Sequence, residues 1–282
     1  MSFTIYTATG CTRCKIIKQL MNEKGIAFEE QDMKAEGKEA FQKFYAANRK
    51  AIFRGPDGVE FPLLHDTEAG IIRQGIGACV AYLYGGGKLD SFFSVGTLHK
   101  EWVDGIHVSG GKPENAEGFL EVLRYIKLTN NMKLQMDTNG LNSAILEQIL
   151  AEGLADVMIM NVVGPKELYS QILGKDVDIA DIEKSAALVI KFPEYKFQTT
   201  ATPVVREEGE ISYLTAKEVA GAAKLIAEAT GSMKNPYLVK LFKPKECKDE
   251  RFKGVEAMAA EALLPYRTAA RAHQVFVEVE KA

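Results

Sequence analysis

The chain contains little cysteine, histidine and tryptophan: its 282 residues include four cysteines, four histidines and one tryptophan. Four cysteines are too few for the disulfide-dense framework of small secreted proteins. No apolar run approaches the roughly 18 residues of a membrane span, so none is predicted. The sequence starts Met1-Ser2 and leads straight into an apolar run, without the pattern of a signal peptide. We therefore expect a cytoplasmic protein with no membrane association.

An excess of charge of either sign is also lacking. The net charge is −3 and the isoelectric point is near 5.9, which gives no reason to expect binding to nucleic acid or to an anionic membrane. Hydrophobic residues make up 46% of the chain and charged residues 26%, as in ordinary globular proteins. The length indicates one large domain or two of ordinary size.

Two of the four cysteines are close together, in the segment Thr9-Gly10-Cys11-Thr12-Arg13-Cys14-Lys15. The segment follows a short apolar run and opens a helical one. A thiol at the start of a helix faces unpaired N–H groups and the positive pole of that helix, which favours the thiolate. Thr12, Arg13 and Lys15 are expected to tune the pair. We predict that Cys11 attacks a substrate disulfide and that Cys14 resolves the mixed disulfide, so that the two form a redox-active disulfide.

Two other interpretations of the pair stay open at this point. Half of a metal site would need a second cysteine pair or a histidine pair, but Cys79 and Cys247 each stand alone and no His-x3-His occurs. An iron–sulfur centre would have to combine Cys11 and Cys14 with one of those two cysteines. The third interpretation is a pair of inert thiols. We favour dithiol–disulfide exchange and predict no metal site.

Residues 1–86 are predicted to form a small domain that begins with a βαβ unit. Three consecutive glycines, 85–87, end it because they cannot continue a helix without a large entropic cost. Residues 87–102 are too apolar for a free linker and should form a bridging segment that packs between the two parts of the chain. The predicted strands are Phe3–Tyr6, Ala27–Asp32, Pro62–His65 and Gly70–Gln74, and the predicted helices are Cys14–Lys24, Lys38–Asn48 and Ile76–Tyr84.

This order of elements, with its Cys-x-x-Cys, resembles the thioredoxin fold, and the length is most similar to glutaredoxins and the small redoxins that serve ribonucleotide reductases. The resemblance implies that Pro62 follows a cis peptide bond and shapes the substrate groove beside the dithiol. The alternative is an ordinary proline at a strand edge. The turn Gln74-Gly75-Ile76-Gly77 lacks the Asp with which glutaredoxins hold glutathione, which argues against glutathione binding. Cys79 is expected to pack inside its helix as a small apolar residue.

From residue 103 to 282, apolar strand-like runs alternate with helical runs. Such alternation predicts a parallel sheet covered by helices. Six strands fit a partial or open (β/α) barrel better than a complete eightfold one. The predicted strands are Gly105–Ser109, Lys133–Asp137, Asp156–Asn161, Lys196–Thr202, Tyr237–Phe242 and Gln274–Val279, and the predicted helices are Ala116–Leu128, Ser143–Glu152, Ile179–Ile190, Ala216–Thr230 and Val255–Ala270.

Two strand ends of this part carry a second resemblance. Ser109-Gly110-Gly111-Lys112-Pro113 is similar to the Ser-Gly-Gly-Glu-Pro of radical S-adenosylmethionine enzymes, and Asp137-Thr138-Asn139-Gly140 resembles the next strand end of their glycyl-radical-activating branch. The nearest relatives by this resemblance activate anaerobic ribonucleotide reductase and pyruvate formate-lyase. Gly110, Gly111, Lys112, Asp137 and Asn139 are the implied ligand-binding candidates at the rim. The alternative is that the glycines serve the strand-to-helix turn and that Lys112 is solvated.

The departures from that family concern its chemistry. The Cys-x3-Cys-x2-Cys that holds the iron–sulfur cluster is absent from the sequence. Lys112 replaces the glutamate of the glycine motif. Asn161 begins the stretch where Asp-x-Lys is expected, and Gln198 stands where an arginine is expected. These combined losses predict a degenerate barrel without radical chemistry.

The sequence thus predicts a two-domain α/β protein, a thioredoxin-like domain followed by a partial (β/α) barrel of radical-S-adenosylmethionine type. The predicted function is thiol–disulfide exchange with a protein disulfide or a reductase. The barrel would dock a partner. The resemblance to activating enzymes implies that this partner is an anaerobic ribonucleotide reductase or a glycyl-radical system. The competing hypotheses are a radical-type activating protein, an iron–sulfur protein, and a ligand-binding module with a redox-sensing dithiol.

Overall fold

The structure, a computed structural model, describes residues 2–98, 101–206, 209–247 and 249–281. The protein is mixed α/β and divides into two compact units. The first unit comprises residues 1–136 and 151–156, and the second comprises 137–150 and 157–282. The boundary between these two compact units therefore differs from the predicted domain boundaries, which lie at 86 and 103.

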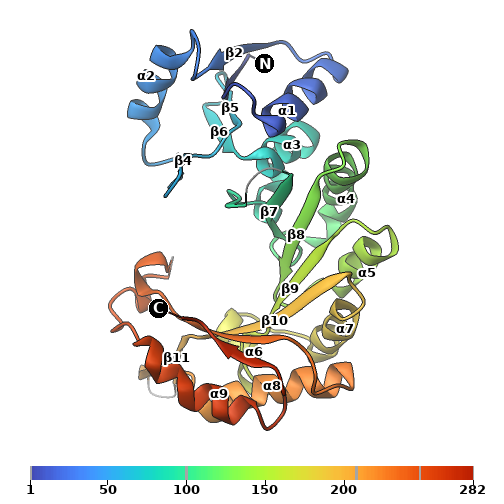
Figure 1. Ribbon diagram of the computed structural model, residues 1–282, viewed down its shortest axis with the longest axis vertical. Helices are drawn as coiled ribbons and strands as arrows, with labels where there is room; N and C mark the ends of the chain where they lie inside the picture. Colours follow the sequence, from blue (N-terminus) through green and yellow to red (C-terminus); the bar gives the residue numbers. More distant parts are fainter. Residues whose placement is uncertain (1, 99–100, 207–208, 248, 282) are drawn as a thin grey trace. The chain divides into compact units, whose positions relative to one another are not determined.

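The first unit contains a four-stranded sheet in the order β2-β1-β5-β6. Its strands are β1 (Phe3–Thr7), β2 (Phe28–Asp32), β5 (Leu63–Asp66) and β6 (Ile71–Gln74). Strand β2 runs parallel to β1, whereas β5 is antiparallel to both β1 and β6. Helix α2 (Lys38–Asn48) lies on one side of the sheet, and α1 (Thr12–Glu23) and α3 (Ile76–Gly85) lie together on the other (Figure 1). The strands and helices predicted for this part are confirmed to within about two residues at most ends.

Apolar side chains explain why the sheet is covered on both sides. Phe41 and Phe44 of α2 are buried in one cluster with Tyr6 and Leu63, and the rings of Tyr6 and Phe44 stack with centroids 4.2 Å apart. On the other side, Ile17 of α1 is fully buried. A short hairpin that the sequence analysis did not predict, β3 (Arg54–Gly55) with β4 (Gly58–Val59), lies between α2 and β5.

The described part of the bridging segment belongs to the first unit, whereas the sequence analysis expected it to pack between the two parts. Helix α3 ends at the glycines, where Gly86 takes a φ of +58°, and residues 86–92 continue as a 3-10 helix. Phe92 is fully buried, and its ring stacks on that of Phe119 with centroids 4.2 Å apart. Phe119 belongs to α4 (Ala116–Arg124), which also packs against α3. This continuous packing explains why residues 103–136 belong to the first compact unit.

A six-stranded parallel sheet has the order β14-β13-β10-β9-β8-β7. Its strands are β7 (Trp102–His107), β8 (Lys133–Thr138), β9 (Val157–Asn161), β10 (Glu194–Ala201), β13 (Tyr237–Leu241) and β14 (Val277–Val279). The helices of the second unit are α5 (Ser143–Ala151), α6 (Tyr169–Leu173), α7 (Ile179–Val189), α8 (Ala216–Thr230) and α9 (Leu264–Ala270). A hairpin that the sequence did not predict, β11 (Pro203–Val205) with β12 (Ile211–Tyr213), follows β10.

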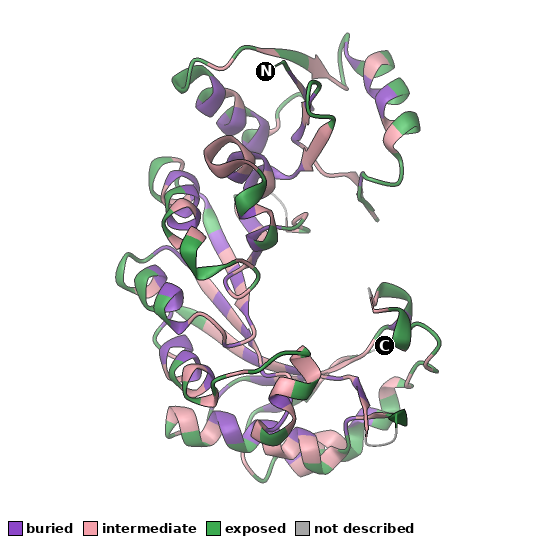
Figure 2. Ribbon diagram, turned by 180° about the vertical axis from the view of Figure 1, so that it is seen from behind, coloured by how far each residue is buried: buried purple, intermediate pink, exposed green. Residues whose placement is uncertain are grey.

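Burial alternates along the strands of the second unit, as Figure 2 shows. On β10, Phe197, Thr199 and Ala201 are buried, whereas the residues between them, such as Gln198, are half-buried. Successive side chains of a strand point to opposite faces, so each face has its own environment. Helices α7, α8 and α9 pack against strands β9, β10 and β14, respectively.

One predicted helix of the second unit is wrong over its first half. The sequence predicted a helix from 255 to 270, but α9 spans only Leu264–Ala270, and a 3-10 turn precedes it. A helix that began at 255 would place Pro265 in its interior, where proline removes a backbone hydrogen bond and clashes with the preceding turn. Proline is tolerated in the first turn of a helix, and α9 begins accordingly.

Candidate functional site

The dithiol lies where β1 gives way to α1. After β1 the chain turns through Gly10, whose φ of +80° favours glycine, and reaches Cys11. Cys11 is the N-cap of α1, and its Sγ accepts a hydrogen bond of 3.1 Å from the backbone N–H of Cys14. The two cysteines are joined by a disulfide, with Cα atoms 5.3 Å apart. Cys11 thus occupies the helix start that the sequence predicts, facing N–H groups that stabilise a thiolate.

Exposure distinguishes the two cysteines. Cys14 is only 2% exposed, one turn inside the helix. Cys11 is half-buried and lines a cavity of about 670 Å³. Cys11 is therefore more accessible from the cavity than Cys14. This asymmetry is the one that the assignment of attacking and resolving thiols requires.

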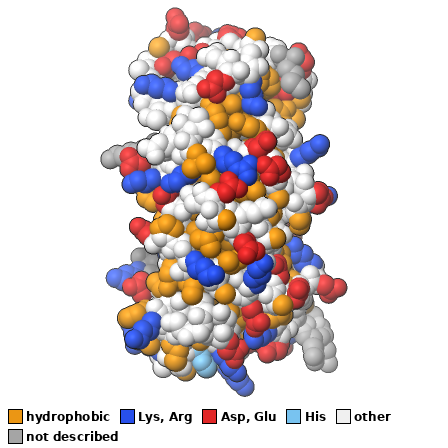
Figure 3. Space-filling model, turned by 90° about the vertical axis from the view of Figure 1, so that its right-hand side faces the viewer, with side chains coloured by type: hydrophobic (Ala, Val, Ile, Leu, Met, Phe, Trp, Pro, Cys, Tyr) orange, Lys and Arg blue, Asp and Glu red, His pale blue; other side chains and the backbone are white. Residues whose placement is uncertain are grey.

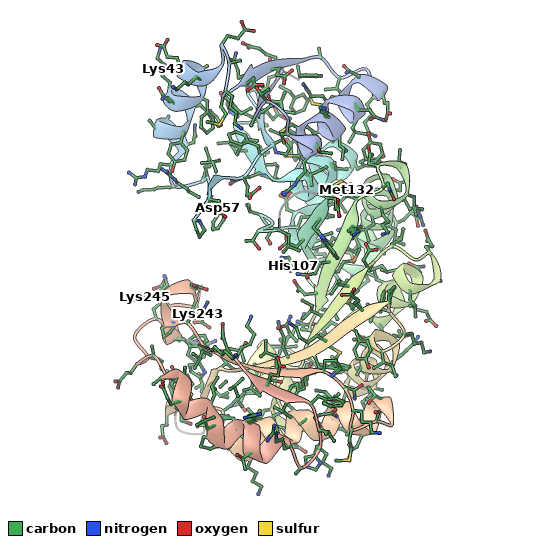
Figure 4. The ribbon with its side chains drawn as sticks, in the orientation of Figure 1. Lys43, Asp57, His107, Met132, Lys243 and Lys245 are labelled. Atoms are coloured by element: carbon green, nitrogen blue, oxygen red, sulfur yellow. A yellow bond between two sulfur atoms is a disulfide. The ribbon has the colours of Figure 1, made fainter. Side chains whose placement is uncertain are left out.

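The cavity has one wall from the dithiol turn and another from the β3–β4 hairpin. Gly10 to Arg13 lie on the first wall, and residues 57–61 lie on the second. Asp57, at the turn of that hairpin, is marked in Figure 4. Glu101 completes the lining. The cavity belongs entirely to the first compact unit.

Gln74 holds the second wall, a role that the sequence analysis missed. It is 4% exposed, and its Nε2 donates to the backbone oxygens of Phe53 (2.9 Å) and Glu60 (3.1 Å). Its Oε1 accepts from the backbone N–H of Phe53 at 2.8 Å. A buried glutamine on β6 therefore clamps both ends of the hairpin. The available signal was a polar residue at the end of an apolar strand, directly before a glycine.

Pro62 stands at the start of β5, and the Phe61–Pro62 peptide bond is cis. Pro62 is buried, and its carbonyl oxygen accepts from the backbone N–H of Gly75 at 2.9 Å. Phe61, rather than Pro62, lines the cavity beside Cys11. The structure thus anchors Pro62 to the loop before α3.

The three residues predicted to tune the dithiol have different surroundings. Thr12 is exposed and lines the cavity, and Lys15 is exposed on α1. Arg13 is buried, lies 3.3 Å from a carboxylate oxygen of Glu60, and donates to the backbone oxygen of Leu98 at 2.5 Å. Its charge is therefore shared with Glu60, and its main structural effect is to join α1 to the hairpin wall and to the bridging segment.

Asp32 is a second residue that the sequence analysis did not single out. Its carboxylate accepts from the backbone N–H of Lys34 at 2.8 Å and from the hydroxyl of Thr9 at 2.7 Å. These hydrogen bonds, first the one from Lys34 and then the one from Thr9, hold the pKa of Asp32 below its ordinary value. Asp32 thereby ties the turn before Cys11 to the end of β2.

Cys79 packs inside α3 as predicted. Its thiol is fully buried and lies 3.4 Å from the backbone oxygen of Arg73 and 3.7 Å from that of Pro62. Burial raises the pKa of Cys79 to about 12. Because the thiolate is the form that binds metals and attacks disulfides, Cys79 is poorly suited to either role.

Gly110 and Gly111 lie on a turn that packs closely against the bridging segment. A Cβ atom on Gly110 would come 2.1 Å from the backbone oxygen of Ser91, and one on Gly111 would come 2.0 Å from the ring of Phe92. The glycines are therefore required by packing, which favours the alternative of a structural turn. Lys112 is exposed, with its Nζ 3.8 Å from a carboxylate oxygen of Glu114.

Asp137 and Asn139 belong to the second unit, whereas Gly110, Gly111 and Lys112 belong to the first. Asp137 is half-buried in β8. The side-chain oxygen of Asn139 accepts from the backbone N–H of Leu141 at 3.2 Å, and its backbone oxygen accepts from the Tyr169 hydroxyl at 2.7 Å. These bonds give Asn139 a role in the turn that follows β8.

Asn161 and Gln198 are neighbours on β9 and β10, at positions where the sequence resemblance led us to expect charged residues. The side-chain amide of Gln198 donates to that of Asn161. Both side chains are neutral, and their amides are hydrogen-bonded to each other.

Cys247 is half-buried and lines another cavity of the second unit. This cavity has a volume of about 230 Å³, and its lining includes Lys240 and Lys243.

A search of the described residues finds no group of three or more His, Cys, Asp or Glu placed to hold a metal ion. In the same residues, none of the helices combines the length and the apolar character that crossing a membrane requires. Comparison with protein-family models gave no match, and comparison with the curated proteins gave none either.

Proposed function

We propose that this protein is a dithiol–disulfide oxidoreductase whose first unit has a thioredoxin-like fold. The observation that carries the proposal is the asymmetric dithiol at the start of α1, with Cys11 on a cavity and Cys14 buried behind it. The strand order β2-β1-β5-β6 supports the same assignment.

The proposed reaction begins with the reduced protein. The Cys11 thiolate attacks one sulfur of a substrate disulfide, forms a mixed disulfide and releases the first substrate thiolate. Cys14, after losing its proton, attacks the Cys11 sulfur and releases the second substrate thiolate. The two thiolates take up two protons, the substrate gains two electrons, and Cys11 and Cys14 end as the disulfide found in the structure. A thiol donor or a reductase regenerates the dithiol.

The substrate that we propose is a protein segment that carries a disulfide. A cavity of about 670 Å³ is well within the range of pockets that hold sizeable ligands. Its second wall is a hairpin, held by Gln74, along which an extended segment would lie. The proposed role of the second unit, in keeping with its sequence resemblance, is to dock a partner such as an anaerobic reductase or its activating system.

Trapping of mixed disulfides tests this proposal. With Cys14→Ser, the mixed disulfide on Cys11 has no resolving thiol and should accumulate, whereas Cys11→Ser should trap nothing. Cys247→Ser serves as the matched control and should behave like the wild-type protein. The proposal fails if reduced Cys14→Ser forms no adduct with a protein disulfide, or if Cys11→Ser forms adducts through Cys14.

A further inference from the structure

A second cavity lies in the second unit, at the edge of the sheet where its strands begin. It has a volume of about 310 Å³ and is bounded by the first residues of β13 and β14 and by α9. Its chemically distinctive lining residues are Lys196, Arg267, Arg271, Val275, Phe276 and Glu278. This edge is opposite to the strand ends at which Asn139 and Asn161 lie.

Three cations line this cavity without ion-pair partners. Among the described residues, no carboxylate lies within 4.0 Å of the charged groups of Lys196, Arg267 or Arg271. Glu278 is the one carboxylate in the lining, so the lining carries an excess of two positive charges.

Most arginines elsewhere in the chain are compensated. Arg124, for example, lies 2.6 Å from carboxylate oxygens of both Glu117 and Glu152, and Arg206 lies 2.6 Å from one of Glu218. Figure 3 likewise shows acidic and basic side chains interspersed on one face of the molecule. The cavity differs from these sites because its lining brings together two arginines and a lysine that have no ion pair among the described residues.

The placement of the two arginines costs stability unless an anion compensates it. Arg267 and Arg271 stand four residues apart at the end of α9, and like charges at that spacing on a helix repel each other. The negative pole of a helix end attracts cations and accounts for part of this arrangement. It does not account for Lys196, which comes from β10 and lines the same cavity.

One guanidinium is already oriented. The Nε of Arg267 donates to the backbone oxygen of Val277 at 3.1 Å, and Arg267 is half-buried. This bond fixes the plane of the group and leaves its two terminal nitrogens for another acceptor. A guanidinium held in this way is suited to two-pronged binding of phosphate or carboxylate oxygens.

Two apolar side chains form part of the rim of the cavity. Phe276 is 58% exposed and Val275 is 51% exposed. Both are held by the backbone: Val275 N–H donates to the oxygen of Met233 at 2.7 Å, and the oxygen of Phe276 accepts from Tyr237 N–H at 3.0 Å. Two exposed apolar side chains thus lie beside a lining that carries an excess of two positive charges.

We infer that this cavity binds a small organic anion, a phosphate monoester or a carboxylate that carries an apolar group. The anionic group contacts Arg267, Arg271 and Lys196, and the apolar group lies against Phe276 and Val275. The volume is at the lower end of the range for ligand pockets, which fits a small molecule. This site is separate from the dithiol and does not depend on the function proposed for it.

Calorimetric titration of the full-length protein with phenyl phosphate tests the inference. Saturable binding at one site per chain is expected. Inorganic phosphate, which lacks the apolar group, and phenol, which lacks the charge, should each bind at least about tenfold more weakly. Arg267→Gln and Arg271→Gln should each weaken phenyl phosphate binding by about tenfold or more, because hydrogen bonds between charged groups are the strong ones.

Arg251→Gln is the matched control, since Arg251 is an arginine of the same unit that pairs with Asp249 and does not line the cavity. It should leave the affinity unchanged, and circular dichroism should show that all three variants are folded. Absence of saturable binding up to about 10 mM, or equal affinity in wild type and both cavity variants, would overturn the inference. Tighter binding of a glutamate-rich peptide than of phenyl phosphate would also overturn it, because the surface would then be a protein-docking site.

Discussion

The dithiol turn and the rim of strand ends both carry motifs that resemble catalytic ones, but their surroundings differ. At the dithiol turn, Cys11 lies on a cavity, Gln74 holds the hairpin wall of that cavity, and Asp32 ties the turn before Cys11 to β2. At the strand ends, Asn139 is bonded to its own turn and Asn161 to Gln198. In the first region Cys11 borders a cavity, whereas in the second the polar groups of Asn139, Asn161 and Gln198 make hydrogen bonds within the protein.

The comparison shows that a sequence motif can form a binding or catalytic site only if its polar groups are not all used in hydrogen bonds within the protein. At least one of them must remain accessible to a ligand. A glycine pair illustrates the point, because the same Gly-Gly that lets a backbone approach a cofactor also lets a turn approach a phenylalanine ring. In this protein Gly111 lies against Phe92. A sequence match at a strand end is therefore weaker support for chemistry than a match at a helix start beside a cavity.

The largest expected effect is the loss of disulfide reduction in Cys11→Ser. With dithiothreitol as donor, the wild-type protein should accelerate the reduction of insulin, followed by turbidity, and the variant should fall to the uncatalysed rate. The reason is that only Cys11 presents its sulfur to the cavity. Cys79→Ser is unsuitable as a control because it changes a buried site, so Cys247→Ser is used. Equal rates of insulin reduction by Cys11→Ser and the wild-type protein would contradict the proposal that the dithiol turn, unlike the strand ends, is catalytic.

An all-or-none test of the other region is the cleavage of S-adenosylmethionine. We expect no 5′-deoxyadenosine after anaerobic iron–sulfur reconstitution and reduction with dithionite, measured by chromatography. The cluster needs three neighbouring thiolates, and the sequence has no Cys-x3-Cys-x2-Cys to supply them. Stoichiometric product would show that the strand ends are catalytic after all.

Gly111→Ala should destabilise the first unit by about 1–3 kcal/mol, the usual cost of overpacking a filled site. The added Cβ would come 2.0 Å from the Phe92 ring, which is itself fully buried. Gly254→Ala is the control, because no atom lies within 4 Å of a Cβ at that position. The measurement is urea unfolding followed by circular dichroism. A value for Gly111→Ala as small as that of the control would mean that the glycine turn is loose enough to serve a ligand.

The smallest expected effect is the pH dependence contributed by Asp32. Because its pKa is lower in the folded protein than its ordinary value of 3.8, the ionised carboxylate stabilises the fold above that value. The contribution is lost as the pH falls through the lowered folded pKa. Asp32→Asn should therefore lower the urea midpoint at neutral pH, and the difference from wild type should shrink on acidification.

Asp176→Asn, at an exposed position of the second unit, is the matched control and should not reproduce that pH dependence. A difference between Asp32→Asn and wild type that is constant from neutral to strongly acidic pH would contradict the assignment of the low pKa to Asp32.

The sequence by itself determined the local structure and the position of the dithiol. Apolar periodicity and glycine are short-range signals, so the strands, the helix start at Cys11 and the end of α3 at the glycines were predictable. Only the tertiary structure decided which polar side chains make hydrogen bonds within the protein and which remain accessible. Gln74, Asp32 and the Asn161–Gln198 pair act across 14, 23 and 37 residues of chain, and Lys196 lines a cavity with Arg271 from a distant helix end. Hydrogen bonds and charges depend on distance in space, which a local pattern of residues does not contain.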